Sequence, residues 1–213
     1  MLKLIEHYLS LQGEGLRAGK LTYFVRFAGC NLRCQWCDSK FSFGKGKQIP
    51  FQKIVKEIKN SKAQFVCLTG GEPLLHESDC LRLIHHFPKI HFDVETGGAL
   101  DISKLQFKNS SIIMDWKLHH SGMKDRMKKE NLPLLRRSHD LLKFVTDMSD
   151  SDQKEISRIM KQTKKSEFQI SLQPLHGSEA IKCADWIIRQ KNPRLQINLQ
   201  IHKYIWPRNT RKV

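Results

Sequence analysis

Three cysteines fall close together near the start of the chain: Cys30, Cys34 and Cys37, with the spacing C-x3-C-x2-C. Thiolates are soft ligands that suit iron–sulfur clusters, and a short loop lets several of them reach one centre. A structural zinc site takes four protein ligands, and an electron-transfer cluster normally has four cysteines. The local set here ends at three. We therefore expect a cluster with one iron left open to a small molecule.

The alternative at this loop is a zinc site whose fourth ligand comes from elsewhere in the chain. The candidates for that ligand are Cys67, Cys80 and His76. Zinc motifs usually pair two cysteines at C-x2-C with a second pair farther along, so this alternative ranks second. We expect Cys67, Cys80 and Cys183 to be buried, unpaired thiols.

A glycine-rich segment, Thr69-Gly70-Gly71-Glu72-Pro73, follows an apolar run that is typical of a strand. Glycines let the backbone approach a ligand closely, and a carboxylate can receive an ammonium group. Alone, such a segment is usually an ordinary turn from a strand into a helix. Its pairing with the cysteine loop makes a binding role more specific.

The elements that must position these segments are short apolar runs alternating with helical patterns, which is typical of βα units and a mostly parallel sheet. Both segments follow a strand candidate. Ligands of parallel α/β folds lie at the carboxyl ends of strands, so we expect the cysteine loop and the glycine-rich segment to line the opening of one shared site. The predicted strands are Thr22–Phe27, Gln64–Leu68, His91–Glu95, Ile112–Met114, Leu141–Val145, Phe168–Leu172 and Leu195–Gln200. The predicted helices are Phe51–Lys59, Asp79–His86, Ser151–Thr163 and Ser178–Gln190.

The chain length bounds the fold. With 213 residues, 39% of them hydrophobic, the chain suits a single domain over residues 1–213. A full (β/α)8 barrel typically needs about 250 residues, so we expect an α/β fold that is a partial or modified TIM-like barrel. In the last predicted helix, Ile181, Ala184 and Ile188 follow helical spacing and Ser178 is the expected N-cap.

The chain is strongly basic, with a formal net charge of +16. Such a balance suits a nucleic acid, an anionic partner or a solvated basic face. No recognition helix or aromatic–basic RNA motif accompanies the positive charge, so we expect no nucleic-acid partner. The alternative outside the enzymes is a zinc-containing RNA-binding module. The sequence also has no long apolar run and no signal-peptide pattern, from which we expect a cytoplasmic protein without a membrane partner.

The cysteine spacing, with Trp36 before the last cysteine, resembles the signature of the radical S-adenosylmethionine (SAM) superfamily. The resemblance implies a radical SAM core in which three thiolates hold a [4Fe–4S] cluster and the fourth iron binds SAM. One electron from the cluster then cleaves SAM to a 5′-deoxyadenosyl radical. In that superfamily a segment matching Gly70–Glu72 contacts the SAM amino group.

Further segments resemble the 7-carboxy-7-deazaguanine synthase family of this superfamily. They run in order along almost the whole chain: Leu11–Gly15, Phe24–Leu32, Trp36–Ser39, Glu95–Gly98, Leu142–Val145, Gln173–Pro174 and His202–Tyr204. The resemblance implies a lyase that converts 6-carboxy-5,6,7,8-tetrahydropterin to 7-carboxy-7-deazaguanine with loss of ammonia, in deazapurine and queuosine biosynthesis. It also implies Mg2+ and a homodimer. The positive charge suits an acidic, flavodoxin-like electron donor.

The resemblance also implies roles for individual residues, none of them catalytic because the SAM-derived radical does the chemistry. Arg26, a fixed fork-shaped cation, is expected at the substrate carboxylate, and Ser39 beside Mg2+. The other implied substrate contacts are Leu11, Gln12, Gly13 and Thr69. The implied SAM contacts are Trp36, Cys37, Asp38, Gly71, Glu72, Asp115, Trp116, Lys117, Gln173, Pro174, Leu175 and His176.

Three residues in two segments depart from the family pattern, and one rival family shares part of that pattern. Asp115-Trp116 stands where some members have Ser-Pro, and His176 stands where Asp is usual. The C-terminal segment His202–Pro207 is expected to fold back towards the substrate.

A glycyl-radical-enzyme activase shares the cysteine spacing and the short chain but acts on a protein glycine. Gln12–Gly15 and Asp38-Ser39 argue against it.

Overall fold

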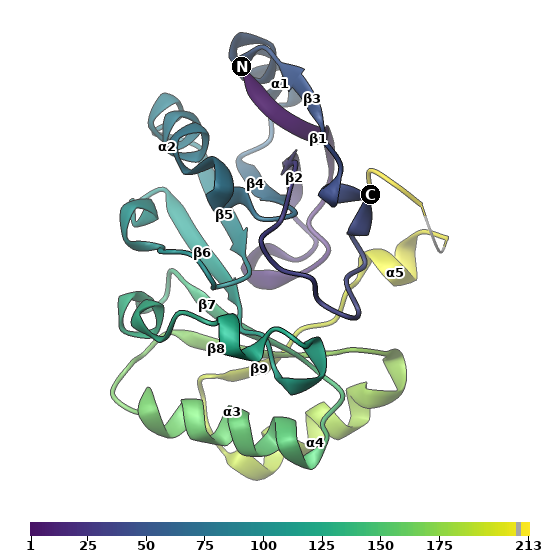
Figure 1. Cartoon of the computed structure of the whole chain (residues 1–213), viewed down its shortest axis with the longest axis vertical. Helices are drawn as coiled ribbons and strands as arrows, with labels where there is room; N and C mark the ends of the chain where they lie inside the picture. Colours follow the sequence, from purple (N-terminus) through teal and green to yellow (C-terminus); the bar gives the residue numbers. More distant parts are fainter. Residues whose placement is uncertain (208–209) are drawn as a thin grey trace.

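The computed structural model describes residues 1–207 and 210–213, in which one mixed sheet is covered by helices (Figure 1). The strands are β1 (Leu2–Leu11), β2 (Leu21–Phe27), β3 (Lys47–Ile49), β4 (Phe65–Gly70), β5 (His91–Thr96), β6 (Ser110–Asp115), β7 (Leu141–Thr146), β8 (Gln169–Pro174) and β9 (Leu195–Ile197). Their order is β3-β1-β2-β4-β5-β6-β7-β8-β9. Pairing is parallel from β2 to β9, and β1 is antiparallel to both β2 and β3. With β3 and β9 as its edges, the sheet is an open, partial barrel, as predicted.

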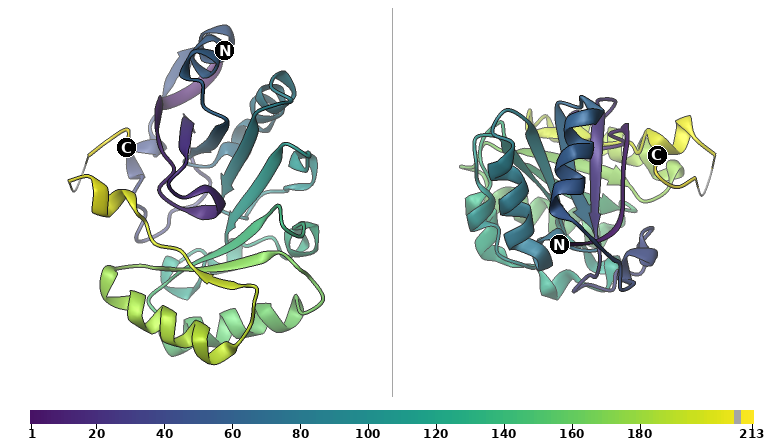
Figure 2. Two further views of the ribbon diagram at one scale, coloured as in Figure 1. Left: turned by 180° about the vertical axis from the view of Figure 1, so that it is seen from behind. Right: turned by 90° about the horizontal axis from the view of Figure 1, so that it is seen from above.

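The helices are α1 (Phe51–Ser61), α2 (Glu77–His86), α3 (Asp150–Gln162), α4 (Ala180–Gln190) and α5 (His202–Ile205). The first four lie on the outer side of the sheet, whereas the C-terminal segment with α5 runs on the opposite side, beside β1 and the turn that follows it (Figure 2). The connections β5–β6 and β6–β7 contain only 3-10 turns in place of helices. No helix among the described residues is long and apolar enough to cross a bilayer.

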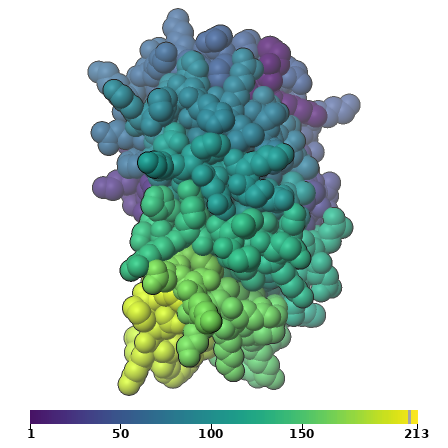
Figure 3. All heavy atoms as spheres, turned by 90° about the vertical axis from the view of Figure 1, so that its left-hand side faces the viewer, coloured from purple at the N-terminus to yellow at the C-terminus, as the bar shows by residue number. Residues whose placement is uncertain are grey.

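The strands follow one another across the sheet largely in chain order, so the colours change steadily down one side of the molecule (Figure 3). The middle strands are covered on both faces, which explains their short continuous apolar runs. All six residues of β7 are buried. On the outer side, the helices present apolar stripes; in α1 the buried residues Phe51, Ile54, Val55 and Ile58 recur at helical spacing.

The seven predicted strands and four predicted helices are confirmed, with ends that differ by a few residues. Two strands, β1 and β3, were not predicted. Strand β1 was missed because Glu6, Tyr8 and Ser10 interrupt its apolar run, and the first two of these line a cavity. The predicted strand Leu195–Gln200 is too long, since β9 ends at Ile197.

The expected start of the last long helix is wrong, and two of its residues at helical spacing are exposed. Helix α4 begins at Ala180 with Glu179 as its N-cap, because Gly177–Glu179 form a separate 3-10 turn that contains Ser178. Ile181 and Ile188 are 73% and 71% exposed. The helix packs instead through Cys183 and Trp186, which are three residues apart and buried.

Candidate active site

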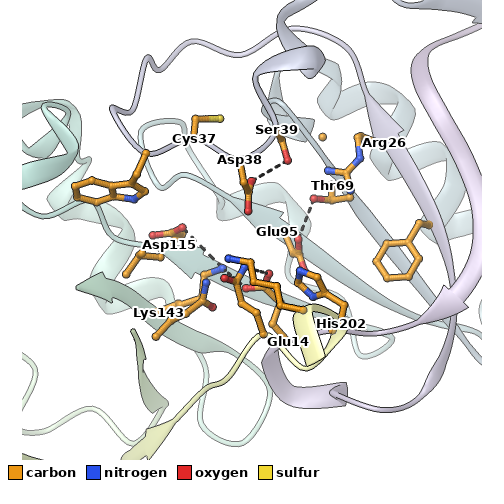
Figure 4. Close-up of a pocket in the computed structure, with 18 of the residues that line it drawn as sticks. Glu14, Arg26, Cys37, Asp38, Ser39, Thr69, Glu95, Asp115, Lys143 and His202 are labelled. Carbon is orange, nitrogen blue, oxygen red and sulfur yellow. Dashed lines mark hydrogen bonds and ion pairs between the residues drawn. The ribbon is translucent and has the colours of Figure 1, made fainter. Parts of the chain in front are cut away.

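One cavity of about 970 Å3 opens at the carboxyl ends of the parallel strands, as the strand order predicted. Side chains from several elements converge in it (Figure 4). The predicted site residues that line it are Gln12, Gly13, Arg26, Cys30, Cys34, Trp36, Cys37, Asp38, Ser39, Thr69, Gly71, Glu72, Asp115, Lys117, Gln173, Pro174, Leu175 and His176.

Two predicted residues lie outside the lining. Leu11 ends β1, where it pairs with Leu21. Trp116 is 2% exposed and packs in the core, and its indole nitrogen has no hydrogen-bond partner among the described residues. Trp116, which stands where some family members have Pro, is therefore a core side chain. Its backbone nitrogen donates a hydrogen bond to the Lys143 carbonyl, 2.8 Å away.

The three cysteines of the loop after β2 are unpaired, half-buried and line the cavity. Burial raises the pKa of Cys30 and of Cys34, while the Lys117 ammonium opposes that rise at both thiols. Among the described residues, the one group of three His, Cys or acidic side chains whose ligand atoms all lie within 4.8 Å of one another is elsewhere. The three sulfurs are thus spread more widely than ligands of a single ion, and such a donor set fits a multi-iron cluster better than zinc.

The proposed fourth zinc ligands are not free to join this loop. Cys67 and Cys80 are fully buried and do not line the cavity. The Cys80 thiol donates to the Pro73 carbonyl, and the His76 ring nitrogen lies 2.7 Å from the Ala28 carbonyl oxygen. The geometry therefore argues against the zinc alternative.

The glycine-rich turn after β4 packs directly against the start of the cysteine loop. The amide of Glu72 donates to the Gly29 carbonyl at 2.9 Å. A Cβ atom at Gly71 would lie 1.9 Å from that carbonyl oxygen, and one at Gly70, where φ is +140°, would lie 2.3 Å from the Phe27 oxygen. The glycines are required here because two backbones approach each other closely.

We expect Gly71→Ala to loosen the cysteine loop, because the added methyl group displaces the Gly29 carbonyl. Overpacking of this kind costs about 1–3 kcal/mol, which corresponds to a fall in melting temperature of roughly 2–12 °C. Gly177→Ala is the matched control, since nothing lies within 4 Å of a Cβ atom there. Differential scanning fluorimetry of both variants measures the effect; equal melting temperatures would contradict the assigned packing.

The Glu72 carboxylate is fully buried and holds two loops together. It accepts hydrogen bonds from the amides of Leu74 and Gly97, at 3.0 and 2.8 Å, and from the Thr96 hydroxyl. Burial raises its pKa, although these hydrogen bonds oppose the rise. Glu72 thus links the turn after β4 to the turn after β5, and its contacts are already largely satisfied.

A chain of charges crosses the floor of the cavity, and the sequence did not predict it. The Lys143 ammonium donates to Glu14 at 2.8 Å and lies 3.8 Å from Asp115, which pairs with Lys117 at 2.7 Å. Burial alone would raise the pKa of Glu14, but the nearby Lys143 outweighs it and lowers the pKa to about 2. The Gln200 amide also donates to Glu14. The Glu14 carboxylate is therefore held as an anion.

Arg26 reaches the cavity from β2 and is held in place by β1. Its guanidinium donates to Glu6 at 3.0 Å and to the Tyr8 hydroxyl at 3.4 Å. Arg211, near the C-terminus, donates to the other oxygen of Glu6 at 2.8 Å. The buried Glu6 carboxylate thus orients two cations at the mouth.

Thr69 and Gln12 share one acceptor. The Thr69 hydroxyl donates to Glu95 at 2.9 Å, and the Gln12 amide donates to the other oxygen of Glu95 at 3.3 Å (Figure 4). Glu95 lies on β5 and was not among the predicted site residues. These three side chains present a fixed row of hydrogen-bonding groups.

The C-terminal segment folds back over the cavity, as the resemblance implied. The Ile201 amide donates to the Gly13 carbonyl at 2.9 Å, and His202 covers Gly13 so closely that a Cβ there would lie 2.0 Å from the ring. His202, Lys203, Tyr204, Trp206 and Pro207 line the cavity, whereas Ile205 does not.

At the rim, Ser39 donates a hydrogen bond to the exposed carboxylate of Asp38 at 2.9 Å. Across the cavity, Gln173 is buried and accepts from Asn198, and His176 is exposed with its amide donating to Glu179. His176 is the N-cap residue of the turn Gly177–Glu179, at the position where family members have a carboxylate.

The functional candidates that sequence reasoning missed are Glu6, Glu14, Glu95, Lys143 and Arg211. Charged residues inside buried strands were the available signal: Lys143 is the one charge in β7, and Glu95 lies in β5, most of whose residues are buried. A charge within a buried strand is costly unless it is paired, so it indicates a polar interior.

Comparisons with known proteins agree with this geometry. Residues 24–173 match the family profile of the Radical SAM superfamily. The chain is 34% identical to the 7-carboxy-7-deazaguanine synthase of Clostridium acetobutylicum, over 99% of both chains. It is 35% identical to that of Methanospirillum hungatei JF-1, over 96% of this chain and 85% of the relative.

Among solved structures, the crystal structure of QueE from Escherichia coli is similar, with a TM-score of 0.73, 19% identity and coverage of 93% of both chains. At that identity the likeness supports the fold alone. The family profile covers most of the chain, and the two relatives are similar over almost its whole length. The chain therefore belongs to the radical SAM superfamily and, within it, to the 7-carboxy-7-deazaguanine synthase family.

Proposed function

We propose that this chain converts 6-carboxy-5,6,7,8-tetrahydropterin to 7-carboxy-7-deazaguanine with loss of ammonia, in deazapurine and queuosine biosynthesis. The observation that carries the proposal is that three unpaired thiols and a fixed arginine line the same cavity. The thiols suit a cluster, and the arginine suits the carboxylate of the substrate. The family to which the chain belongs supports the same activity.

Membership of the superfamily implies a [4Fe–4S] cluster and SAM. Cys30, Cys34 and Cys37 are the residues that would hold the cluster. When bound, the cluster and SAM supply a carbon-centred radical that removes a hydrogen atom from the substrate. The protein's task is to bind, to orient and to exclude competing reactions.

We assign SAM to the side of the cavity formed by Trp36–Asp38, the turn at Gly71, and the segments 115–117 and 173–176. Gly70 and Gly71 of the turn line the cavity there, and Lys117 adds a largely buried cation. Glu72 acts mainly by positioning, since its oxygens already bind the neighbouring loops. Leu11 and Trp116 take part at most through their backbones.

We assign the pterin to the other side of the cavity, between Gln12–Gly13, Arg26 and Thr69. Arg26 keeps Glu6 on one edge of its guanidinium and offers the remaining N–H groups to a substrate carboxylate. The C-terminal segment covers Gly13 and limits access of water from that side. Glu95 fixes the hydroxyl of Thr69 and the amide of Gln12 for hydrogen bonding.

The remaining assignments depend on the family and on charge. Asp38 and Ser39 offer adjacent oxygen ligands at the rim, which suits Mg2+. We propose residues 1–213 as a single radical SAM domain that forms a homodimer in the cytoplasm, where a reducing environment preserves unpaired thiols. Its net charge of +16 suits an acidic, flavodoxin-like electron donor.

Product formation tests the proposed activity. Anaerobically reconstituted, chemically reduced protein is incubated with SAM, Mg2+ and carboxytetrahydropterin, and the mixture is analysed by liquid chromatography and mass spectrometry. We expect 7-carboxy-7-deazaguanine. Absence of that product, together with activation of a partner protein on a glycine, would replace the proposed function by the activase alternative.

The variant Arg26→Gln tests the assigned position of the substrate carboxylate. We expect kcat/KM for the pterin to fall about 30–5000-fold, since loss of one partner of a buried charge pair costs roughly 2–5 kcal/mol. Iron content should stay unchanged, because Arg211 continues to pair with Glu6. An equal loss of iron and of pterin turnover would contradict this role.

A further inference from the structure

Outside the cavity, three potential metal ligands gather where β7 leads into α3. They are His120 from the turn His119–Ser121, Asp147 directly after β7, and Asp152 in the first turn of α3. One ligand atom from each lies within 4.8 Å of the others, and within the described residues this is the one such group. None of the three lines the cavity of the active site.

The contacts within this group leave one carboxylate oxygen without a partner in the part of the chain that the structure describes. Asp147 uses one oxygen to accept from the Ser149 amide and holds the other 3.2 Å from Nδ1 of His120. Asp152 uses Oδ2 to accept from the Thr146 hydroxyl at 2.8 Å. Its Oδ1 is buried, has no hydrogen-bond partner within residues 1–207 and 210–213, and lies 4.0 Å from the same His120 nitrogen.

This oxygen calls for an explanation, because the side chain of Asp152 is only 1% exposed. A buried carboxylate oxygen without a partner costs free energy unless a proton, a cation or a metal ion satisfies it. The oxygen faces an imidazole and a second carboxylate, which are both metal ligands. The cluster also concentrates negative charge in a chain whose net charge is +16.

The spacing suits a small transition-metal ion. Ligand bonds of about 2.0–2.1 Å in a tetrahedral zinc site place donor atoms about 3.3 Å apart. The separation between His120 Nδ1 and Asp147 Oδ2 is 3.2 Å, and the 4.0 Å to Asp152 closes with a small side-chain rotation. His120 and Asp147 are partly exposed, so water can complete the coordination. An imidazole ligand disfavours Mg2+ and Ca2+, which prefer oxygen alone.

We propose that His120, Asp147 and Asp152 form a second metal site, which binds one divalent transition-metal ion of the zinc type. The ion ties the connection between β6 and β7 to the start of α3. That connection supports the cysteine loop, because the amide of Gln35 donates to the Ser121 carbonyl at 3.1 Å. The ion therefore acts as a brace behind the loop, and the proposal does not depend on the reaction assigned to the cavity.

Zinc binding to the full chain tests the proposal. Cluster-loaded protein, in which the three loop thiols are occupied, is dialysed anaerobically against zinc chloride, and zinc and iron are measured per chain. We expect one zinc in the unmodified protein, with binding weakened by at least about 100-fold in Asp152→Asn and His120→Gln, since loss of even an outer-shell partner costs roughly 10–100-fold. Asp150→Asn is the matched control, because Asp150 is exposed and the substitution removes the same charge from the same helical turn as Asp152→Asn.

Thermal stability gives a second readout that needs no activity. At a zinc concentration of about 100 times Kd, binding should raise the melting temperature of the unmodified protein and of Asp150→Asn by roughly 5–10 °C. The melting temperature of Asp152→Asn should not respond. Equal zinc retention in all four proteins would show adventitious surface binding, and no zinc in any of them would show a simple charge cluster. Either result overturns the proposal.

Discussion

Cys34→Ala is expected to abolish reductive cleavage of SAM, and the same holds for alanine at Cys30 or Cys37. Three thiols line the cavity and no fourth side chain among those considered, Cys67, Cys80 or His76, is free to replace one of them. A cubane held by two thiolates loses its iron readily, so both cluster content and SAM cleavage should fall to background. Iron analysis and detection of 5′-deoxyadenosine measure the two effects.

The control for this series is Cys183→Ala. Cys183 is buried in α4, outside the cavity, where its thiol acts as a small apolar group. Its loss should cost about 1 kcal/mol of stability and leave SAM cleavage nearly intact. An essential Cys183 together with a dispensable Cys34 would show that the ligands have been assigned wrongly.

Lys143→Met should be the most destabilising single change in the cavity. It leaves Glu14 as a buried carboxylate without its main counter-charge, and breaking such a pair costs about 3–5 kcal/mol. A fall in melting temperature of at least about 6 °C corresponds to that loss. Lys56→Met, which removes an exposed charge from α1, should change the melting temperature little.

The double variant Glu14→Gln/Lys143→Met separates the pair from its surroundings. If the cost of Lys143→Met comes from an unpaired Glu14, removing both charges should recover most of the stability, because Gln200 can still hydrogen-bond to glutamine. Asp115 keeps Lys117 as its partner in both variants. Additive losses in a denaturant-unfolding cycle would contradict the proposed coupling.

The parallel part of the fold could be predicted because its signals are local. Central strands such as β7 are buried on both faces and show a short apolar run, and helices such as α1 show a regular apolar stripe. Strand β1 could not be predicted in this way, since Glu6 and Tyr8 face a cavity and break the pattern. Helix α4 carries two isoleucines on its exposed face, so the spacing of its apolar residues does not by itself identify the buried side.

The location of the site could be predicted as well as the parallel part of the fold, but from residue types and their spacing and not from apolar patterns. The cysteine loop and the turn at Gly70–Gly71 carry their signals in residue type and spacing, and both follow strands that end at one edge of the sheet. Glu14 and Lys143 lie in segments that resemble the family, but nothing in the sequence indicates that they pair with each other, and Arg211 lies outside those segments. They meet only after the chain folds: Glu14 and Lys143 are 129 residues apart, and Glu6 and Arg211 are 205 apart.

The most direct test of the account is spectroscopy of anaerobically purified protein, with iron and zinc measured in the same sample. We predict about four irons per chain, a brown colour and, after one-electron reduction, an electron paramagnetic resonance signal that changes when SAM is added. The change reports SAM at an iron that no protein side chain occupies. A colourless protein with stoichiometric zinc, or a cluster signal that SAM leaves unaltered, would contradict the account.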